Sequence, residues 1–195
     1  MKNKYILILL FLIYTTGISA QSYKFEILVK GDHIGTIEGD IDTTGNMIKV
    51  NIVALAEAHF IIDERVKYQL NSIYKNGELY FSSATIFLNG DPHFSSVVRK
   101  DGPYYMITKN EHKSMFTEMI DYSGSLLYFM EPTNRSEIFS EIDNIEKPIT
   151  YEGDSVYKIV NPKNGYVSYF TYEDGILKTA KIHHTYIDIE IRRIQ

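Results

Sequence analysis

The chain has 195 residues, of which 44% are hydrophobic and 23% are charged, and it carries a formal net charge of −5. This length is typical of one domain, the apolar fraction is sufficient for a core, and the acidic balance disfavours nucleic-acid binding, so a wholly disordered chain and a nucleic-acid-binding protein are both excluded. The sequence has no cysteine, which excludes disulfide bonds and thiolate chemistry, while its 16 tyrosines and 10 phenylalanines favour strands.

The first 20 residues have the organisation of a secretory signal peptide. Lys2 and Lys4 precede an apolar run at 5–14, and small or polar residues lead to Ala20. The run is shorter than the roughly 20 residues that a transmembrane helix needs, so we expect cleavage near Ala20 and a secreted or periplasmic protein without a transmembrane segment. An uncleaved membrane anchor is the alternative. Cleavage would remove two lysines and no acidic residue, which changes the net charge from −5 to −7.

Both ends of the mature chain, residues 21–195, alternate apolar and polar side chains with the period of a half-buried strand. We expect strands at 23–30 and 187–192. The side chains predicted to face the core are Tyr23, Phe25, Ile27 and Val29 in the first strand, and Ile187, Ile189 and Ile191 in the last.

Dipeptides that tolerate positive φ divide the sequence between these ends. The clearest is Asn76-Gly77, which lies between strand-like runs at 66–74 and 79–88 and predicts a hairpin turn. Asn164-Gly165 and Asp174-Gly175 predict similar turns, and further breaks lie at 89–92 and 101–103. Additional strands are expected near 47–58, 93–99, 104–108, 126–130, 155–160, 166–173 and 176–186.

Helix is expected only in two short segments, 113–120 and 136–142, and neither is long enough to be stable without the sheet. Turn signals about ten residues apart are typical of an antiparallel meander. The predicted fold class is therefore all-β, with 21–195 as a single domain. It consists of one curved antiparallel sheet, either open or closed into a barrel-like form, with one or two short helices. The segment 110–125 is the least strand-like, so we expect it to cover one face.

Common catalytic motifs are absent from the sequence. It contains no G-x-S-x-G elbow, no H-E-x-x-H zinc motif and no Gly-rich phosphate loop. Glu137 and Glu141 would share one face of the second predicted helix, and we interpret this acid pair as solvated surface. The sequence therefore predicts no catalytic residue, no cofactor and no enzymatic activity.

Metal-binding patterns are weak. Only His183 and His184 are adjacent among the six histidines, and neighbouring residues on a strand point to opposite faces. The segment 40–45 begins like a calcium loop, but Asn51 stands where a bidentate glutamate is needed, so a polar hairpin loop is favoured. No metal site is predicted.

The tyrosines at strand positions permit two interpretations. Buried rings whose hydroxyls find a partner are ordinary core packing, whereas the same rings inside a curved sheet could line an amphipathic cavity for an apolar or lipid-like ligand. The sequence leaves both open and identifies no ligand-binding residue. The tyrosines concerned are Tyr68, Tyr74, Tyr157, Tyr169 and Tyr172.

Several motifs resemble a family of secreted Bacteroidetes proteins that share a domain of unknown function. The motifs are Gly31, Ile34-Gly35, Tyr122-Ser123, Leu127–Pro132, Ser140-Glu141, Tyr157–Ile159, Asn161–Gly165 and Tyr169–Gly175. Soon after the Ser-Glu pair, where that family tends to carry glycine, this chain has Ile142-Asp143-Asn144. The resemblance implies secretion and a β-rich domain, without an assigned activity or functional residue. The opening strand is also loosely similar to periplasmic β-domains that carry apolar cargo.

Three functional hypotheses follow. The first is an exported β-domain protein that binds an apolar small molecule in a concave sheet. The alternative is a structural or protein-interaction module of the cell envelope that uses a strand edge or the covering segment. The third is an unrecognised hydrolase, which clustering of His183 or His184 with an acidic residue in a pocket would favour.

Overall fold

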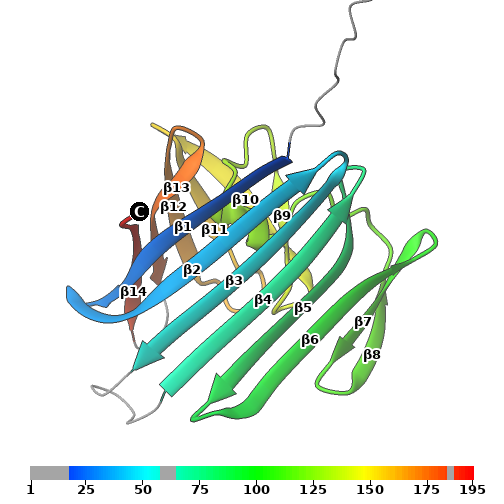
Figure 1. Ribbon diagram of the computed structural model, residues 1–195, viewed down its shortest axis with the longest axis horizontal. Helices are drawn as coiled ribbons and strands as arrows, with labels where there is room; N and C mark the ends of the chain where they lie inside the picture. The colour runs from blue at the N-terminus through cyan, green and yellow to red at the C-terminus, as the bar shows by residue number, and fades with distance from the viewer. Residues whose placement is uncertain (1–17, 58–64, 184–186) are drawn as a thin grey trace, which may run out of the picture.

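The computed structural model describes residues 18–57, 65–183 and 187–195. Within these residues the chain forms fourteen strands of a single antiparallel sheet and one short 3-10 helix (Figure 1). The all-β prediction is therefore confirmed. No helix in this part of the chain is long and apolar enough to span a membrane. Of the predicted signal peptide, residues 1–17 lie outside the described residues, and Ile18–Ala20 begin the first strand.

Two meanders make up the sheet. In the first, each strand pairs with the next along the chain: β1 (Ile18–Val29), β2 (Asp32–Thr44), β3 (Met47–Glu57), β4 (Arg65–Lys75), β5 (Glu78–Leu88), β6 (Asp91–Asp101), β7 (Tyr104–Lys109) and β8 (His112–Phe116). The second comprises β9 (Glu137–Ser140), β10 (Ile145–Gly153), β11 (Val156–Val160), β12 (Val167–Glu173), β13 (Ile176–His183) and β14 (Asp188–Arg193).

The first and last strands join the two meanders. In the ladder between β1 and β14, Ile27 lies opposite Ile191, so both chain ends meet inside the sheet and β8 and β9 are left as its edges. The sheet curls so that β9–β13 lie behind the broad face formed by β1–β6 (Figure 1). No ladder closes the sheet, but the ring of Phe116 on β8 lies 5.2 Å from that of Phe139 on β9.

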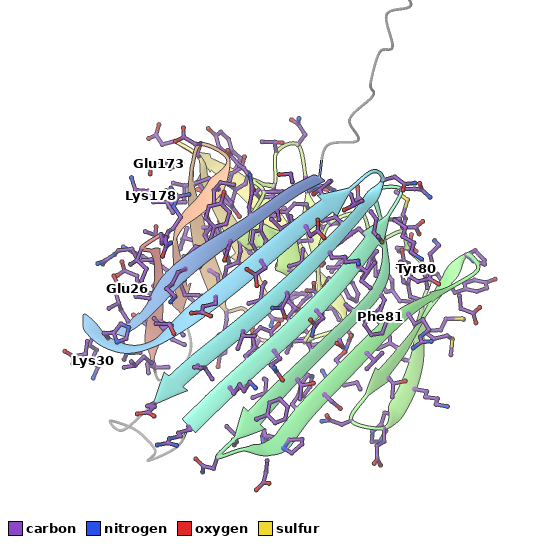
Figure 2. The ribbon with its side chains drawn as sticks, in the orientation of Figure 1. Glu26, Lys30, Tyr80, Phe81, Glu173 and Lys178 are labelled. Atoms are coloured by element: carbon purple, nitrogen blue, oxygen red, sulfur yellow. The ribbon has the colours of Figure 1, made fainter. Side chains whose placement is uncertain are left out.

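The turn chemistry follows the sequence at most hairpins. Asn76 and Gly77 adopt φ of 54° and 78° between β4 and β5, and Asp174 and Gly175 adopt 55° and 76° between β12 and β13. Both predictions of a two-residue turn are confirmed. Across the β12–β13 turn, Glu173 and Lys178 form an exposed ion pair of 2.6 Å (Figure 2).

The Asn164-Gly165 turn differs from its prediction. Only Gly165 has positive φ, and the connection from β11 to β12 is a longer loop. Pro162 cannot donate a ladder hydrogen bond, so the strand ends before it. The Asn161 carbonyl then accepts hydrogen bonds from the backbone N–H groups of Asn164 and Gly165, and its side chain accepts one from Lys163 N.

Both predicted helices are wrong. Residues 112–116 of the first segment form edge strand β8, and residues 137–140 of the second form β9. Each short segment gains more from pairing with an existing strand than from one or two isolated helical turns. The strand predicted at 126–130 is also wrong, since residues 124–128 form the 3-10 helix η1 (Gly124–Tyr128). Its consecutive Leu126 and Leu127 are both buried, which a strand with only one covered face would not allow.

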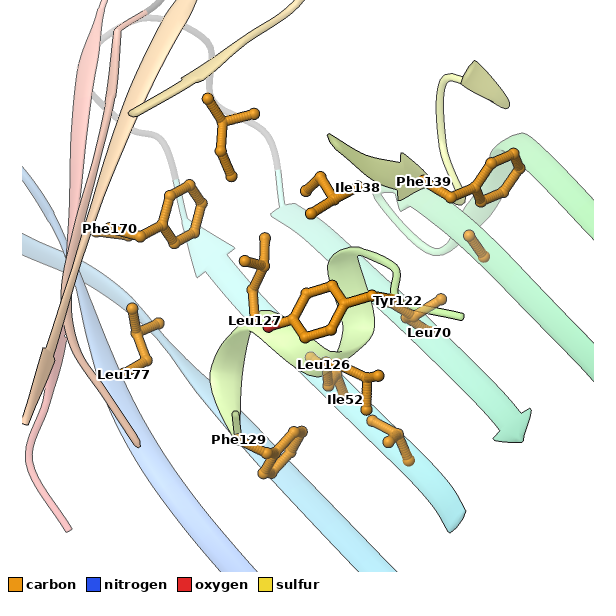
Figure 3. Close-up of a cluster of buried hydrophobic side chains, with 14 of the residues drawn as sticks. Ile52, Leu70, Tyr122, Leu126, Leu127, Phe129, Ile138, Phe139, Phe170 and Leu177 are labelled. Atoms are coloured by element: carbon orange, nitrogen blue, oxygen red, sulfur yellow. The ribbon is translucent and has the colours of Figure 1, made fainter. Parts of the chain in front are cut away.

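The chain between β8 and β9, residues 117–136, crosses the concave face and is called here the crossing segment. The predicted cover at 110–125 begins too early, because 110–116 belong to the β7–β8 hairpin. The crossing segment contributes Leu126, Leu127 and Phe129 to the hydrophobic core, where they meet inward residues of both meanders (Figure 3). The concave side is therefore largely filled. Inward residues of the sheet in this core include Phe25, Ile37, Ile52, Leu70, Ala84, Val98, Phe170, Leu177 and Ile191.

Gly39 leaves the room that Phe129 occupies. The Phe129 ring is buried and packs at 6.0 Å from the Tyr23 ring and 6.4 Å from the Tyr128 ring. A Cβ at residue 39 of β2 would lie 2.9 Å from Phe129 Cζ, which is closer than ordinary van der Waals contact. The missing side chain therefore lets the crossing segment sit directly on the sheet.

Gly39→Ala should lower the free energy of unfolding by about 1–3 kcal/mol, the usual cost of overpacking. In a Phe129→Leu background, which lacks the Cζ atom, the same change should be neutral or stabilising, because alanine restricts the unfolded chain more than glycine does. Urea unfolding of the two single variants and the double variant measures this coupling. Equal costs of Gly39→Ala in both backgrounds would contradict the packing described.

Candidate functional site

Tyrosine hydroxyls attach the crossing segment to the second meander. Tyr172 on β12 donates a hydrogen bond of 2.9 Å to the Leu127 carbonyl, and Tyr157 on β11 donates one of 2.9 Å to Glu131 Oε1. Both rings are buried, so these tyrosines combine core packing with a polar anchor. Tyr169 points to the opposite face of β12, where its ring lies 6.1 Å from that of His183.

A buried carboxyl group from outside the crossing segment contacts this segment near its start. Glu141, directly after β9, is only 3% exposed. Its Oε1 accepts hydrogen bonds from Ser123 Oγ and, at 3.0 Å, from the backbone N–H of Ser125. Because the Ser123 proton goes to Glu141, Tyr74 on β4 donates its own to Ser123 Oγ, over 2.5 Å. This chain of hydrogen bonds joins β4, the crossing segment and the residue after β9.

Burial dominates the electrostatics of this cluster. Desolvation raises the pKa of Glu141 above its ordinary value of 4.5, and hydrogen bonds from Ser123 and Ser125 only partly oppose it. Among the described residues, no lysine, arginine or histidine forms an ion pair with this carboxyl. Burial and the nearby Glu141 also raise the pKa of Tyr74, so its hydroxyl stays a neutral donor.

The interpretation of Glu137 and Glu141 as a solvated acid pair on a helix is wrong for Glu141. In strand β9 and the residue after it, the two side chains are not on a common helical face, and only Glu137 is exposed. The sequence signal for the cluster was present in the motifs Tyr122-Ser123 and Ser140-Glu141, which the structure brings together through a bridge between Ser123 and Phe139. Because the two motifs are separated along the chain, the sequence alone did not indicate that they form one cluster.

A hollow of about 240 Å³ lies beside Glu141, on the concave side of the sheet. Its walls are largely apolar, and its polar part consists of Tyr68, Tyr128, Ser140, Glu141, Asp143 and Lys147. Neither Tyr68 nor Tyr128 uses its hydroxyl in a hydrogen bond to another described residue. The principal lining residues are Tyr68, Leu70, Leu127, Tyr128, Glu141, Ile142, Phe170 and Ile182.

An ion pair closes one side of this hollow. Lys147 Nζ lies 2.5 Å from Asp143 Oδ2, and the two residues also line a second hollow of about 260 Å³. Burial would raise the pKa of Asp143, but Lys147 holds it below its ordinary value. The turn before Lys147 contains Asn144 with φ of 56°, so asparagine takes the left-handed position where the resembling family tends to carry glycine.

Among the described residues, the hydrolase candidate and the calcium-like segment lie in different parts of the sheet. His183 Nδ1 contacts Asp188 Oδ1 at 2.9 Å, and His183 also lines the second hollow with Asp143, Ser168 and Ile182. An acidic residue therefore shares a hollow with His183, which is the arrangement that the hydrolase hypothesis names. His184 lies outside the described residues. The calcium-like segment was expected in a hairpin loop, but 40–44 belong to β2 and only Gly45 is in the turn. The described ranges contain no group of three side chains suited to a metal ion.

These observations define a β-barrel-like domain whose open sheet is filled by its own crossing segment. Residues 25–194 match the family model for a domain of unknown function, DUF6134. The chain therefore belongs to the DUF6134 family. No curated protein sequence matches it.

Among solved structures, a β-barrel-like protein of the domain of unknown function DUF1849 from Brucella abortus is similar in fold. The TM-score is 0.59, with 7% sequence identity, and the match covers 90% of this chain and 95% of that one. At this identity the likeness concerns the fold alone.

Glu141→Gln should change how stability depends on pH. Because the pKa of Glu141 is raised in the folded state, its stabilising contribution is complete below pH 4.5 and is lost as the pH rises through the raised pKa. The amide retains an oxygen for Ser123 and Ser125 but does not ionise. The variant should therefore gain on the wild type with rising pH, by about 1.4 kcal/mol for each unit of pKa shift.

Urea unfolding at a series of pH values measures this difference. Glu137→Gln is the matched control, since Glu137 is an exposed acid on the strand β9 that directly precedes Glu141, and it should follow the wild-type curve. Parallel wild-type and Glu141→Gln curves would show that the buried carboxyl does not titrate differently in the folded protein.

Proposed function

We propose that this protein is exported and binds a small apolar molecule in the hollow beside Glu141. The observation that carries the proposal is the apolar wall of that hollow, formed by residues such as Leu70, Leu127 and Phe170 and interrupted only by a few polar groups. Sites for small molecules in proteins commonly have this composition. The β-barrel-like fold is compatible with such a role, although fold alone does not specify function.

The size of the hollow limits the ligand. A volume of about 240 Å³ equals the space of about eight water molecules and lies below the common range for ligand sites, which begins at roughly 300 Å³. The proposed ligand is therefore a short apolar molecule, or one short chain of a larger lipid-like molecule. A long acyl chain does not fit unless part of it stays outside.

The proposal that the protein is exported rests on the sequence of residues 1–20. The proposal that it comes from the Bacteroidetes rests on the motifs quoted in the sequence analysis. Cleavage after Ala20 is compatible with the sheet. It would remove only the three pairs between Ile18–Ala20 and the end of β2. The ladder that joins the two meanders lies further along, from Phe25 to Val29, and would be retained.

A larger side chain in the hollow should weaken the binding of a small apolar molecule. Ile182→Trp places a large ring at the inner face of β13, where Ile182 lines both hollows, and it should weaken binding of the small fluorophore 1-aminonaphthalene by about tenfold or more. Lys181→Trp is the matched control, because the neighbouring side chain is exposed on the outer face. Fluorescence titration of the mature protein measures both affinities.

The proposal fails if the wild-type protein does not bind 1-aminonaphthalene, or if both tryptophan variants bind it as the wild type does. Near-ultraviolet circular dichroism would establish that the variants are folded. Since the natural chain has no tryptophan, each introduced ring also reports its own environment.

A second candidate function is the envelope interaction module. The edge hairpin β7–β8 and the loop after it expose large apolar side chains, with exposed fractions from 40% for Met106 to 66% for Met119. The outer edge of β8 pairs with no other described strand, and such an edge can accept a strand from a partner. The other exposed side chains here are Tyr104 and Met115.

Photo-cross-linking in cells tests this second function. A photoreactive residue at position 115 should give a discrete adduct with an envelope protein, whereas the same residue at Glu38, on the outer face of β2, should not. The absence of any adduct specific to position 115 would remove the support for this role.

A further inference from the structure

We infer that the hollow beside Glu141 selects ligands that carry a protonated amine over ligands that carry a carboxylate. This inference rests on the proposed function and specifies the chemical class of the ligand. It depends on which polar atoms of the lining remain available, and on the balance of charge around them.

Part of the acceptor capacity of Glu141 lies next to the hollow. The hydrogen bonds from Ser123 Oγ and the Ser125 N–H both go to Oε1, and the Ser125 hydroxyl and the Glu141 backbone N–H also interact with the carboxyl group. A Cβ at Gly124, which lines the hollow, would lie 2.9 Å from Oε2, so the lack of a side chain there leaves space next to this oxygen. A carboxyl oxygen in this position can accept a hydrogen bond from a ligand.

Two phenolic oxygens supplement this acceptor. Tyr68 and Tyr128 line the same hollow and use their hydroxyls in no hydrogen bond to another described residue. Burial, with a further contribution from Glu141, raises the pKa of Tyr68 and raises that of Tyr128 to about 12. Both hydroxyls therefore stay neutral, and each has lone pairs that an ammonium group can use.

The charge of the lining opposes an anionic ligand. Within the described parts of the chain, Lys147 is the only cationic residue that lines this hollow, and it is already paired with Asp143. A carboxylate ligand would have to displace that pair or remain unpaired beside Glu141, and an unpaired buried charge is costly. An ammonium ligand meets the opposite situation, because Glu141 can ionise and balance its charge.

Binding of an ammonium ligand is coupled to the ionisation of Glu141. Where the free carboxyl is protonated, an ammonium ligand forms an ion pair with the carboxylate and the carboxyl proton is released to solvent. Where the free carboxyl is already ionised, no proton is released. The raised pKa of Glu141 extends the pH range over which release accompanies binding.

The test compares octylamine, octanol and octanoate, which share one chain and differ in the polar group. Calorimetric titration of the mature protein should show that octylamine binds more tightly than octanoate by about ten- to a hundredfold, the worth of one charge-assisted hydrogen bond. Glu141→Gln should remove this preference, whereas Lys181→Trp on the outer face should keep it and leave the affinity for octanol within about twofold. Titration in two buffers of different ionisation enthalpy should show proton release with octylamine for the wild type and none for Glu141→Gln.

Tyr68→Phe provides a second variant that should fold, because its hydroxyl makes no hydrogen bond that would be lost. It should weaken octylamine severalfold more than octanoate. If octanoate binds as tightly as octylamine, or if Glu141→Gln keeps the preference for the amine, the inference is overturned while the proposed function stands. If none of the three compounds binds, the proposed function itself is overturned.

Discussion

The apolar concave face of the sheet imposes the constraint on which the architecture depends. Among the described strands, the ladder between β1 and β14 is the one that joins the two meanders, and their far edges, β8 and β9, are not paired in a ladder. The face between them would expose residues such as Ile52, Leu70 and Phe170 to water without a cover. The crossing segment supplies that cover from within the chain, and the buried side chains of Leu126, Leu127 and Phe129 contact both meanders.

Polar contacts determine where this cover lies. Hydrophobic burial is non-directional, so apolar side chains alone would allow the crossing segment to shift along the face. The hydrogen bonds from Tyr172 to the Leu127 carbonyl, and from Ser123 and Ser125 to Glu141, permit one position only. A buried carboxyl group costs stability relative to an apolar residue of similar size, and we attribute its presence here to this positioning.

Local signals in the sequence were sufficient for most of the strands and most turns, but not for β2, β8, β9 and β10. Alternation at 23–30 and the Asn76-Gly77 pair depend on neighbouring residues only, and both predictions agree with the structure. The contact of the two chain ends in one ladder could not be predicted, because strand pairing over more than 150 residues leaves no local pattern. The helix predictions at 113–120 and 136–142 failed for a related reason. Short apolar runs fit either period, and their strand partners decide between them.

The candidate site was missed because its members are polar and far apart in sequence. Ser123, Glu141 and Tyr74 are individually ordinary, and only folding brings them together. Yet Ser123 and Glu141 fall within motifs that resemble the family, as do Leu127, Tyr128 and Phe170 beside the hollow. The lining residues Tyr68, Leu70 and Ile182 lie outside those motifs, and Ile142 lies where this chain departs from them.

The candidate site has one part whose residues lie in the quoted motifs and another part whose residues lie outside them. The quoted motifs contain the residues that hold the crossing segment and form the polar end of the hollow. The side chains outside those motifs, such as Leu70 and Ile182, share the apolar wall with Leu127 and Phe170, and their volumes would limit the length and width of a proposed ligand. A change of one such side chain would alter the shape of the hollow without disturbing the hydrogen bonds that place Glu141. If the hollow binds a ligand as proposed, the polar end would determine which chemical group is accepted, while the wall would determine the size of the molecule that carries it.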